Sequence, residues 1–419
     1  MKEIKLLGLD LTLYQETLKN GLNIYYLPMM NNNTYNIQYG VNFGGKTLNF
    51  KYNNEIINIP EGTAHYLEHK MFENEDNKSV YELFESHATS NNAYTNDKRT
   101  IYVCSGTSAF EEDLDILLDL VSKPYFTDEN IEKERGIIEQ EIKQSEDNIY
   151  RTIYNLQLKG LYHSKEYQQT VIGTIDTIKK INKDLLYKIY NYFYVPNNMF
   201  LIITGNFNIN NASKIINKKL SNIKPNNIKL LPINEKEQIK IKRKEITGNN
   251  ETNKILIGIK KDISNINLSK LEIDVYTYIL LEMLFGDSSS FKQELFDKKI
   301  VTSFSVSNEL NDNYLVLRIF GISDNIDLFI SKIEKELKNI NLDEKSFNRI
   351  KKVIISGQVI NSDYSGTMIN NLVSYITLYD DIIPNRLEIL RNLNINTLKE
   401  LINNINFNNK NITIIKKKS

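Results

Sequence analysis

Residues 175–204 read IDTIKKINKDLLYKIYNYFYVPNNMFLIIT, and residues 387–416 read LEILRNLNINTLKELINNINFNNKNITIIK. An offset of 212 positions carries the first stretch onto the second without a gap. In both stretches the spacing of apolar residues predicts an amphipathic helix, followed by an Asn-rich turn and a β-strand. The matching positions are Ile175 with Leu387, Ile178 with Leu390, Ile181 with Leu393, Asn182 with Asn394, Leu186 with Leu398, and residues 200–203 with 412–415.

The offset is about half the length of the 419-residue chain, which indicates a duplicated domain and not a solenoid of short repeats. Coincidence is the alternative, because Asn and Ile are abundant in this sequence. Helical periodicity and turn chemistry agree with the matched identities, and this agreement favours duplication.

Each half mixes strands with long helices, which predicts an α+β fold. We expect two homologous domains, each a mostly antiparallel sheet packed with helices, arranged as a clam-like half-shell. In the first half, the expected strands cover residues 22–27, 35–43, 100–105 and 199–204. The expected helices there cover residues 63–73, 79–86, 109–122 and 128–144.

A chain of 419 residues is too long to fold around one hydrophobic core of ordinary size. The polar stretch from about residue 221 to 253 contains Lys-Pro and Leu-Pro breaks and is typical of a linker. We therefore expect an N-terminal domain at residues 1–222, a linker at 223–253 and a C-terminal homologous domain at 254–419.

Charge and cysteine usage exclude several classes of protein. The chain has 52 basic and 52 acidic side chains, which argues against nucleic acid or an anionic membrane as the main partner. The single cysteine, Cys104, excludes an internal disulfide and fits a reducing compartment. No apolar run approaches the ~20 residues that span a bilayer, and residues 1–12 lack a secretory pattern. We expect a cytoplasmic protein.

Two of the four histidines lie in His65-Tyr-Leu-Glu68-His69, within a segment that begins like a helix after Pro60 and Gly62. Residues four apart share one face of a helix, so both imidazoles can reach one ion. Glu68 lies beside them and can touch water on the metal without ligating it. Two imidazoles require a third protein ligand to make a catalytic zinc site. The alternative is a pair of surface or core histidines on an amphipathic helix.

The third ligand is expected from the helix at residues 128–144. At about 100° per residue, Ile131, Ile138, Ile142 and Ile149 form an apolar stripe, and Glu134 and Glu141 fall beside it. Glu139 instead points toward solvent. Carboxylates in a buried arc are costly unless they are paired or bind a cation. Surface salt bridges from Glu134 and Glu141 are the alternative.

His65-x-x-Glu68-His69, followed by Glu134-Arg135 and by Glu141, resembles the pitrilysin or insulinase family of inverted-motif zinc peptidases. The likeness covers most of the first 205 residues, including residues 18–28, 92–102 and 192–199, and the second half more weakly. Residues 62–73 and 280–286 look closest to a Firmicute branch whose subunits work as unequal pairs.

This resemblance implies roles for individual residues. His65, His69 and Glu141 would bind zinc, Glu68 would be the general base, and Glu134 would orient a ligand. On the predicted edge strand, Asn92 and Ala93 would hold the substrate backbone. The span from His69 to Glu141 is a few residues shorter than is usual in the family, so the choice of Glu141 over Glu139 rests partly on the helical wheel.

The family completes its site with an Arg and a Tyr from a C-terminal-type domain. The positions that we match to them hold Phe296 and Phe304, which offer no side-chain hydrogen-bond donor. We therefore expect a homologous non-zinc subunit to supply both groups in a heterodimer, in preference to a homodimer. A misaligned segment is the alternative explanation.

The resemblance thus implies a zinc-dependent endopeptidase subunit that cleaves short or unfolded peptides, such as a precursor peptide, with water activated by the metal. A non-hydrolytic assembly subunit and a peptide-binding module of the same fold are the two alternatives.

Overall fold

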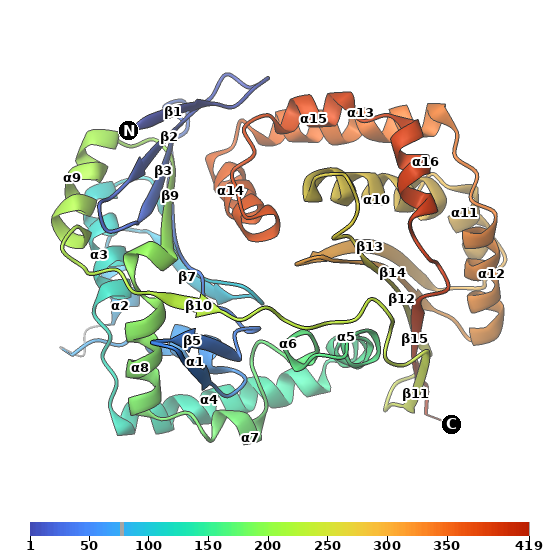
Figure 1. Cartoon of the computed structure of the whole chain (residues 1–419), viewed down its shortest axis with the longest axis horizontal. Helices are drawn as coiled ribbons and strands as arrows, with labels where there is room; N and C mark the ends of the chain where they lie inside the picture. Colours follow the sequence, from blue (N-terminus) through green and yellow to red (C-terminus); the bar gives the residue numbers. More distant parts are fainter. Residues whose placement is uncertain (76–78, 419) are drawn as a thin grey trace. The chain divides into compact units, whose positions relative to one another are not determined.

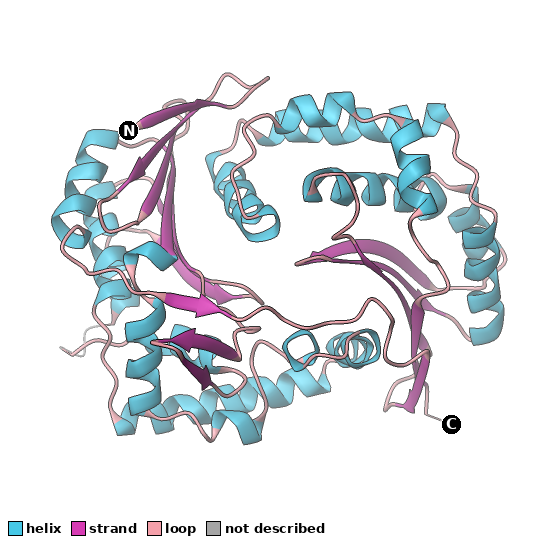
Figure 2. Cartoon of the chain, viewed as in Figure 1, coloured by secondary structure: helices cyan, strands magenta, loops and turns pink. Residues whose placement is uncertain are grey.

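The computed structural model describes residues 1–75 and 79–418 (Figure 1). Contacts divide the chain into two compact units. The first unit comprises Met1–Gln144, Gln169–Ile233 and Val359–Asn385, and the second comprises Ser145–Gln168, Asn234–Gln358 and Arg386–Ser419. Each unit combines a large sheet with helices, as the α+β expectation required (Figure 2). The domain boundaries at 1–222, 223–253 and 254–419 stay a prediction.

The first unit is built on a seven-stranded sheet with the order β1-β2-β3-β9-β4-β8-β7. These strands are β1 (Lys2–Lys5), β2 (Thr12–Thr17), β3 (Asn23–Pro28), β9 (Met199–Gly205), β4 (Tyr35–Val41), β8 (Thr100–Gly106) and β7 (Ser90–Thr95). A small second sheet has the order β10-β5-β6, with β10 (Ile228–Leu230), β5 (Asn49–Tyr52) and β6 (Glu55–Asn58). Strand β7 is therefore an edge strand of the large sheet.

Helices cover both faces of the large sheet. On one face lie α1 (Thr63–Lys70), α2 (Val80–Glu85), α3 (Phe110–Ser122), α4 (Asp128–Asp147), α7 (Ile175–Ile178), α8 (Lys183–Phe193) and α9 (Ile209–Leu220), and on the other lies α14 (Ser365–Tyr379). In the central strand β9, Leu201 and Ile203 join the first core, whereas Phe200 and Ile202 pack with α14. A strand buried on both faces must be apolar throughout, which explains the run at residues 200–203.

The second unit has a five-stranded sheet with the order β11-β15-β12-β14-β13. Its strands are β11 (Arg243–Thr247), β15 (Lys410–Lys416), β12 (Lys254–Asp262), β14 (Tyr314–Ile322) and β13 (Ser303–Asn311). Its helices are α5 (Ile149–Leu161), α6 (Lys165–Gln168), α10 (Lys270–Phe285), α11 (Ser290–Asp297), α12 (Ile326–Lys338), α13 (Glu344–Asn361, whose last turn is grouped with the first unit), α15 (Arg386–Asn392) and α16 (Ile395–Asn403).

The internal repeat is visible in the topology. Strand β9 runs parallel to β3 and antiparallel to β4, and β15 runs parallel to β11 and antiparallel to β12. The order β3-β9-β4-β8-β7 thus recurs as β11-β15-β12-β14-β13. Asn182 caps α8 by accepting a hydrogen bond from the Leu185 amide at 2.9 Å, and Asn394 caps α16 through the Thr397 amide at 3.0 Å. The matched sequence positions therefore have the same structural roles.

The predicted helices and strands of the first half are all present, with small shifts at their ends. Helix α1 ends at Lys70, three residues before the predicted end, whereas α4 continues to Asp147. Ile149 does not extend the apolar stripe of α4, because Asn148 caps a new helix, α5. Residues 223–253, the expected linker, contribute β10 to the first unit and β11 to the second. Among residues 1–75 and 79–418, no helix is both long and apolar enough to cross a bilayer.

The repeat predicts matched effects of two cap substitutions. Replacing an Asn cap with Ala costs about 1 kcal/mol, so Asn182→Ala should speed amide hydrogen exchange about fivefold in the first turn of α8. Asn394→Ala should do the same in α16. Asp at either position retains the cap and serves as the control. Unchanged exchange in either helix would show that its Asn is not a stabilising cap.

Candidate metal centre

Helix α1 carries three of the predicted site residues. It begins after Gly62, whose φ of +87° lies in the left-handed region, and a Cβ there would approach the Ile172 carbonyl oxygen to 2.7 Å. Glycine is the residue that tolerates both constraints. Within the helix, Tyr66 and Leu67 are fully buried in the core. Gly62 thus sets the start of α1. The buried Tyr66 and Leu67 set which face of the helix packs on the core, so His65 and His69 lie on a neighbouring face.

Helix α4 packs beside α1 and brings the distant carboxylates. Ile131, Ile138 and Ile142 are buried, as the predicted stripe required. The Tyr66 hydroxyl donates a hydrogen bond to the Ile131 carbonyl at 2.5 Å, and the fully buried Lys70 donates to the Asn130 carbonyl at 3.1 Å. These two bonds tie α1 to the first turn of α4, so that residues farther along α4 pass beside the histidines.

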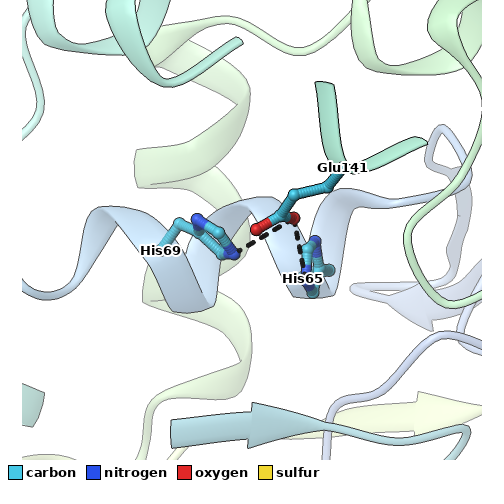
Figure 3. A group of neighbouring side chains, drawn as sticks. All are labelled: His65, His69 and Glu141. Atoms are coloured by element: carbon cyan, nitrogen blue, oxygen red, sulfur yellow. Dashed lines mark ion pairs between the residues drawn. The ribbon is translucent and has the colours of Figure 1, made fainter. Parts of the chain in front are cut away.

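His65, His69 and Glu141 converge on one point (Figure 3). Their potential ligand atoms all lie within 4.8 Å of one another. The Glu141 Oε2 atom is 3.8 Å from His65 Nε2 and 3.7 Å from His69 Nε2. Both distances are too long for hydrogen bonds. They are close to the ~3.3 Å that separates two ligands of one tetrahedral zinc ion with bonds near 2.0–2.1 Å. The three groups therefore fit a shared divalent cation.

Glu134 holds the second imidazole in place. His69 Nδ1 lies 2.8 Å from Glu134 Oε1, and the Glu134 side chain is only 12% exposed. A proton on Nδ1 that faces a carboxylate leaves the Nε2 lone pair free for a metal. Burial works to lower the pKa of His69, but the hydrogen bond with Glu134 and the nearby carboxylates outweigh it and raise that pKa. Burial alone would raise the pKa of Glu134, but the hydrogen bond from His69 outweighs this effect and the pKa of Glu134 is lowered.

Glu68 is the buried carboxylate of the group, 7% exposed. Its Oε2 atom accepts a hydrogen bond of 2.6 Å from the Thr95 hydroxyl on β7. Burial raises the pKa of Glu68, although the Thr95 bond acts in the opposite direction. A carboxylate with a raised pKa is a stronger proton acceptor than one in water. The sequence predicted Asn92 and Ala93 on this strand as substrate-binding residues, but it gave no sign that Thr95 binds Glu68.

Asn92 and Ala93 lie on the edge strand β7, and Asn92 is exposed. Both residues line a cavity of about 1010 Å³ together with Glu68, His69 and Glu134. The Asn92 side chain accepts a hydrogen bond from the Ala93 amide at 2.9 Å. The structure thus brings the two strand residues to the same cavity as the Glu68 carboxylate and the His69 imidazole.

Two details differ from the helical-wheel argument. The helical wheel places Glu134 and Glu141 in an arc between Ile138 and Ile137, but Glu141 is 39% exposed and Ile137 is 45% exposed. The part of the arc that holds Glu141 therefore borders the solvent. The argument that a buried carboxylate needs a partner or a cation therefore applies to Glu134 but not to Glu141. Among the described residues, the His-His-carboxylate group contains Glu141 and does not contain Glu139.

Phe296 and Phe304, the positions matched to the missing Arg and Tyr, both lie in the second unit. Phe296 is 41% exposed on α11. Phe304 is 6% exposed, and its ring contacts those of Phe285, Phe291 and Phe329. Phe304 is thus a core residue with no donor group to offer.

Comparison with known proteins gives a consistent assignment. Residues 58–175 match the model for the insulinase family (peptidase family M16), and residues 180–354 match the model for the M16 inactive domain. The zinc protease YmfH of Bacillus subtilis, itself uncharacterized, is 37% identical over 306 residues, which is 71% of each chain. The beta subunit of the bovine mitochondrial-processing peptidase is 32% identical over 154 residues, 35% of this chain and 30% of that one.

Solved structures agree with these matches. The crystal structure of an M16-like peptidase from Alicyclobacillus acidocaldarius superposes with a TM-score of 0.92 at 26% identity, covering 99% of this chain and 100% of the other. A protease from Helicobacter pylori superposes with a TM-score of 0.82 at 19% identity, over 96% and 99% of the two chains, and shares the fold. The sequence, the fold and the His-His-Glu group together place the chain in the peptidase M16 (insulinase) family, as a zinc protease.

Proposed function

We propose that this protein is a zinc endopeptidase subunit that hydrolyses short or unfolded peptides at the centre formed by α1 and α4. The observation that carries the proposal is the convergence of His65, His69 and Glu141, with Glu68 beside them. His65 and His69 would bind zinc through Nε2, and Glu141 through its carboxylate. Bound zinc supplies a Lewis acid that lowers the pKa of water to about 7.

Glu68 performs the proton transfers in this proposal. Its buried carboxylate takes a proton from the attacking water and passes it to the leaving amine nitrogen. The hydrogen bond from Thr95 fixes one carboxylate oxygen, so the other can face the reacting atoms. Glu134 keeps His69 in the tautomer that leaves Nε2 unprotonated.

The edge strand β7 would bind the peptide backbone. An extended peptide can add as a further strand to an exposed edge, with main-chain hydrogen bonds that do not depend on sequence. Asn92 and Ala93 lie on this edge and line the cavity that includes Glu68. This arrangement supports cleavage of extended or unfolded segments in preference to folded proteins.

We further propose that a homologous non-zinc subunit completes the site by supplying the Arg and Tyr. Support comes from Phe296 and Phe304, which cannot donate hydrogen bonds, and from the bovine relative, which is a subunit of a processing peptidase. Losing one oxyanion donor typically costs ~10²–10³ in rate.

Metal analysis distinguishes the proposed third ligand from its neighbour. The wild-type protein should bind one zinc per chain, and Glu141→Gln should lose most of it, because a neutral amide is a poor zinc ligand. Glu139→Gln, on the same helix, should retain full zinc and is the matched control. Glu134→Gln should weaken zinc affinity about 10–100-fold. Equal zinc in the Glu141 and Glu139 variants would refute the proposed ligand set.

The role of Glu68 predicts a separation of binding from chemistry. Glu68→Gln should keep its zinc and lower peptide hydrolysis by about 10²–10⁴-fold, since the amide cannot accept the proton. Zinc content and cleavage of an internally quenched peptide are measured on the same preparation. Activity near the wild-type level would remove Glu68 from the mechanism.

The partner proposal predicts slow cleavage by this chain alone. Adding the homologous subunit, expressed from the same genome, should raise kcat at least ~10²-fold, as expected for restored oxyanion donors. A partner variant in which its Arg is changed to Ala should assemble but should not activate. Full activity of the isolated chain would contradict the proposal.

A further inference from the structure

A second buried carboxylate in the first unit, Asp113 on α3, forms hydrogen bonds with three side chains from two other segments. Asp113 is 0% exposed. Its Oδ2 atom accepts hydrogen bonds from the hydroxyls of Tyr35 on β4 and Thr89, and its Oδ1 atom lies 2.7 Å from His87 Nδ1. A buried carboxylate is costly unless its oxygens are satisfied. Here both oxygens are satisfied, which makes this cluster a rigid junction.

His87 and Thr89 flank Ala88, whose left-handed backbone conformation is unfavourable for alanine. Helix α2 ends in a turn where the Thr89 amide donates to the Phe84 carbonyl at 3.0 Å and the Ala88 amide donates to Glu85 at 2.9 Å. This pattern places Ala88 in the left-handed position usually taken by glycine, with a φ of 55°. A non-glycine residue there costs ~1–2 kcal/mol. The residues on both sides of Ala88 bind Asp113, so the carboxylate holds the turn in place.

The turn joins two walls of the cavity that contains Glu68 and His69. Ser79 and Tyr81, at the start of α2, line that cavity, and so do Asn92 and Ala93 on β7. The Tyr81 ring stacks on Phe72 with centroids 5.0 Å apart. Strand β7 begins one residue after Thr89. The position of Thr89 therefore fixes where the edge strand starts.

We infer that Asp113, acting through His87 and Thr89, is a positioning residue for peptide binding, which rests on the proposed function of β7. The carboxylate sets the end of α2 and the start of β7, and thereby the spacing between Tyr81 and the strand edge. It touches neither the metal cluster nor the reacting atoms. Its loss should weaken peptide binding while leaving the metal centre and the proton transfer intact.

If the Asp113 cluster only stabilised the fold, removing any of its hydrogen bonds should have the same effect on peptide binding. A Tyr35 variant distinguishes this role from the positioning role. Tyr35 donates to the same Asp113 oxygen as Thr89, and its hydroxyl lies 3.3 Å from that of Thr89. Tyr35 is on β4, however, a strand that contributes no residue to the lining of the cavity, and Thr89 keeps its own bond to Asp113 when the Tyr35 hydroxyl is removed. Removing its hydroxyl should lower stability without moving the cavity walls. Thr89→Val removes a hydroxyl from the same carboxylate at the start of β7 and keeps the side-chain shape.

The test compares Thr89→Val, Thr89→Ser, His87→Leu and Tyr35→Phe in the zinc-loaded full chain, with its partner subunit where required. A dye-labelled peptide that the wild type cleaves is titrated onto each variant in a Glu68→Gln background. We expect Thr89→Val and His87→Leu to weaken its binding about tenfold, the size of a lost hydrogen bond to a charged group. Thr89→Ser should restore binding, and Tyr35→Phe should lower only the melting temperature.

Three further measurements accompany the titration. Amide exchange across residues 84–95 should become faster in Thr89→Val and should stay unchanged in α1, with unchanged zinc content. In the Glu68-containing enzymes, KM should rise and kcat should stay within about twofold, because chemistry is untouched. Unchanged peptide affinity in both Thr89→Val and His87→Leu, or an equal loss in Tyr35→Phe, overturns the inference. Failure of Glu68→Gln to abolish cleavage would instead count against the proposed function. His87→Leu, at a side chain that is 28% exposed, keeps the test available if Thr89→Val does not fold.

Discussion

The packing of α4 against α1 is the constraint on which the rest of this site depends. The two helices are 57 residues apart in sequence, between Lys70 and Asp128, and neither alone can hold an ion. Their contact is fixed by buried isoleucines on α4 and by the hydrogen bond from the Tyr66 hydroxyl to the Ile131 carbonyl. Because Glu141 lies nearly three turns beyond Ile131 on a rigid helix, this one contact determines where its carboxylate meets the two imidazoles.

Electrostatics explain why such a cluster calls for a cation. Glu68, Glu134 and Glu141 surround two imidazoles, and the pKa of Glu68 is raised by its burial and, to a lesser degree, by the charge of Glu141. Like charges gathered at a partly buried site repel one another unless a positive ion balances them. A divalent ion would do so and would also let Glu68 remain ionised as a base. The bond between Glu68 and Thr95 links the proposed base to β7, so the candidate metal centre and the proposed peptide-binding edge form one connected structure.

Much of the fold and the site could be predicted from sequence because the signals were periodic. Apolar spacing located α4, α8 and β9, and the lead-in of Pro60 and Gly62 located α1. The offset of 212 positions identified a repeat that the strand order and the paired Asn caps reproduce. The pairing of His65 with His69 followed from helical geometry alone. Contacts between segments that are far apart in the chain leave no periodic pattern in the sequence, so they could not be predicted. The bond from Thr95 to Glu68 and the bonds from Tyr66 and Lys70 to α4 join residues that only the folded chain brings together. The exposure of Glu141 also departs from the wheel, because a helical wheel gives direction but not the depth of neighbouring side chains.

The most direct test of this account is anomalous diffraction at the zinc absorption edge from crystals of the purified protein. The account predicts one strong anomalous peak, about 2.0–2.2 Å from His65 Nε2, His69 Nε2 and a carboxylate oxygen of Glu141. A zinc-replete crystal with no peak there, or with a peak bound by Glu139 in place of Glu141, would contradict it.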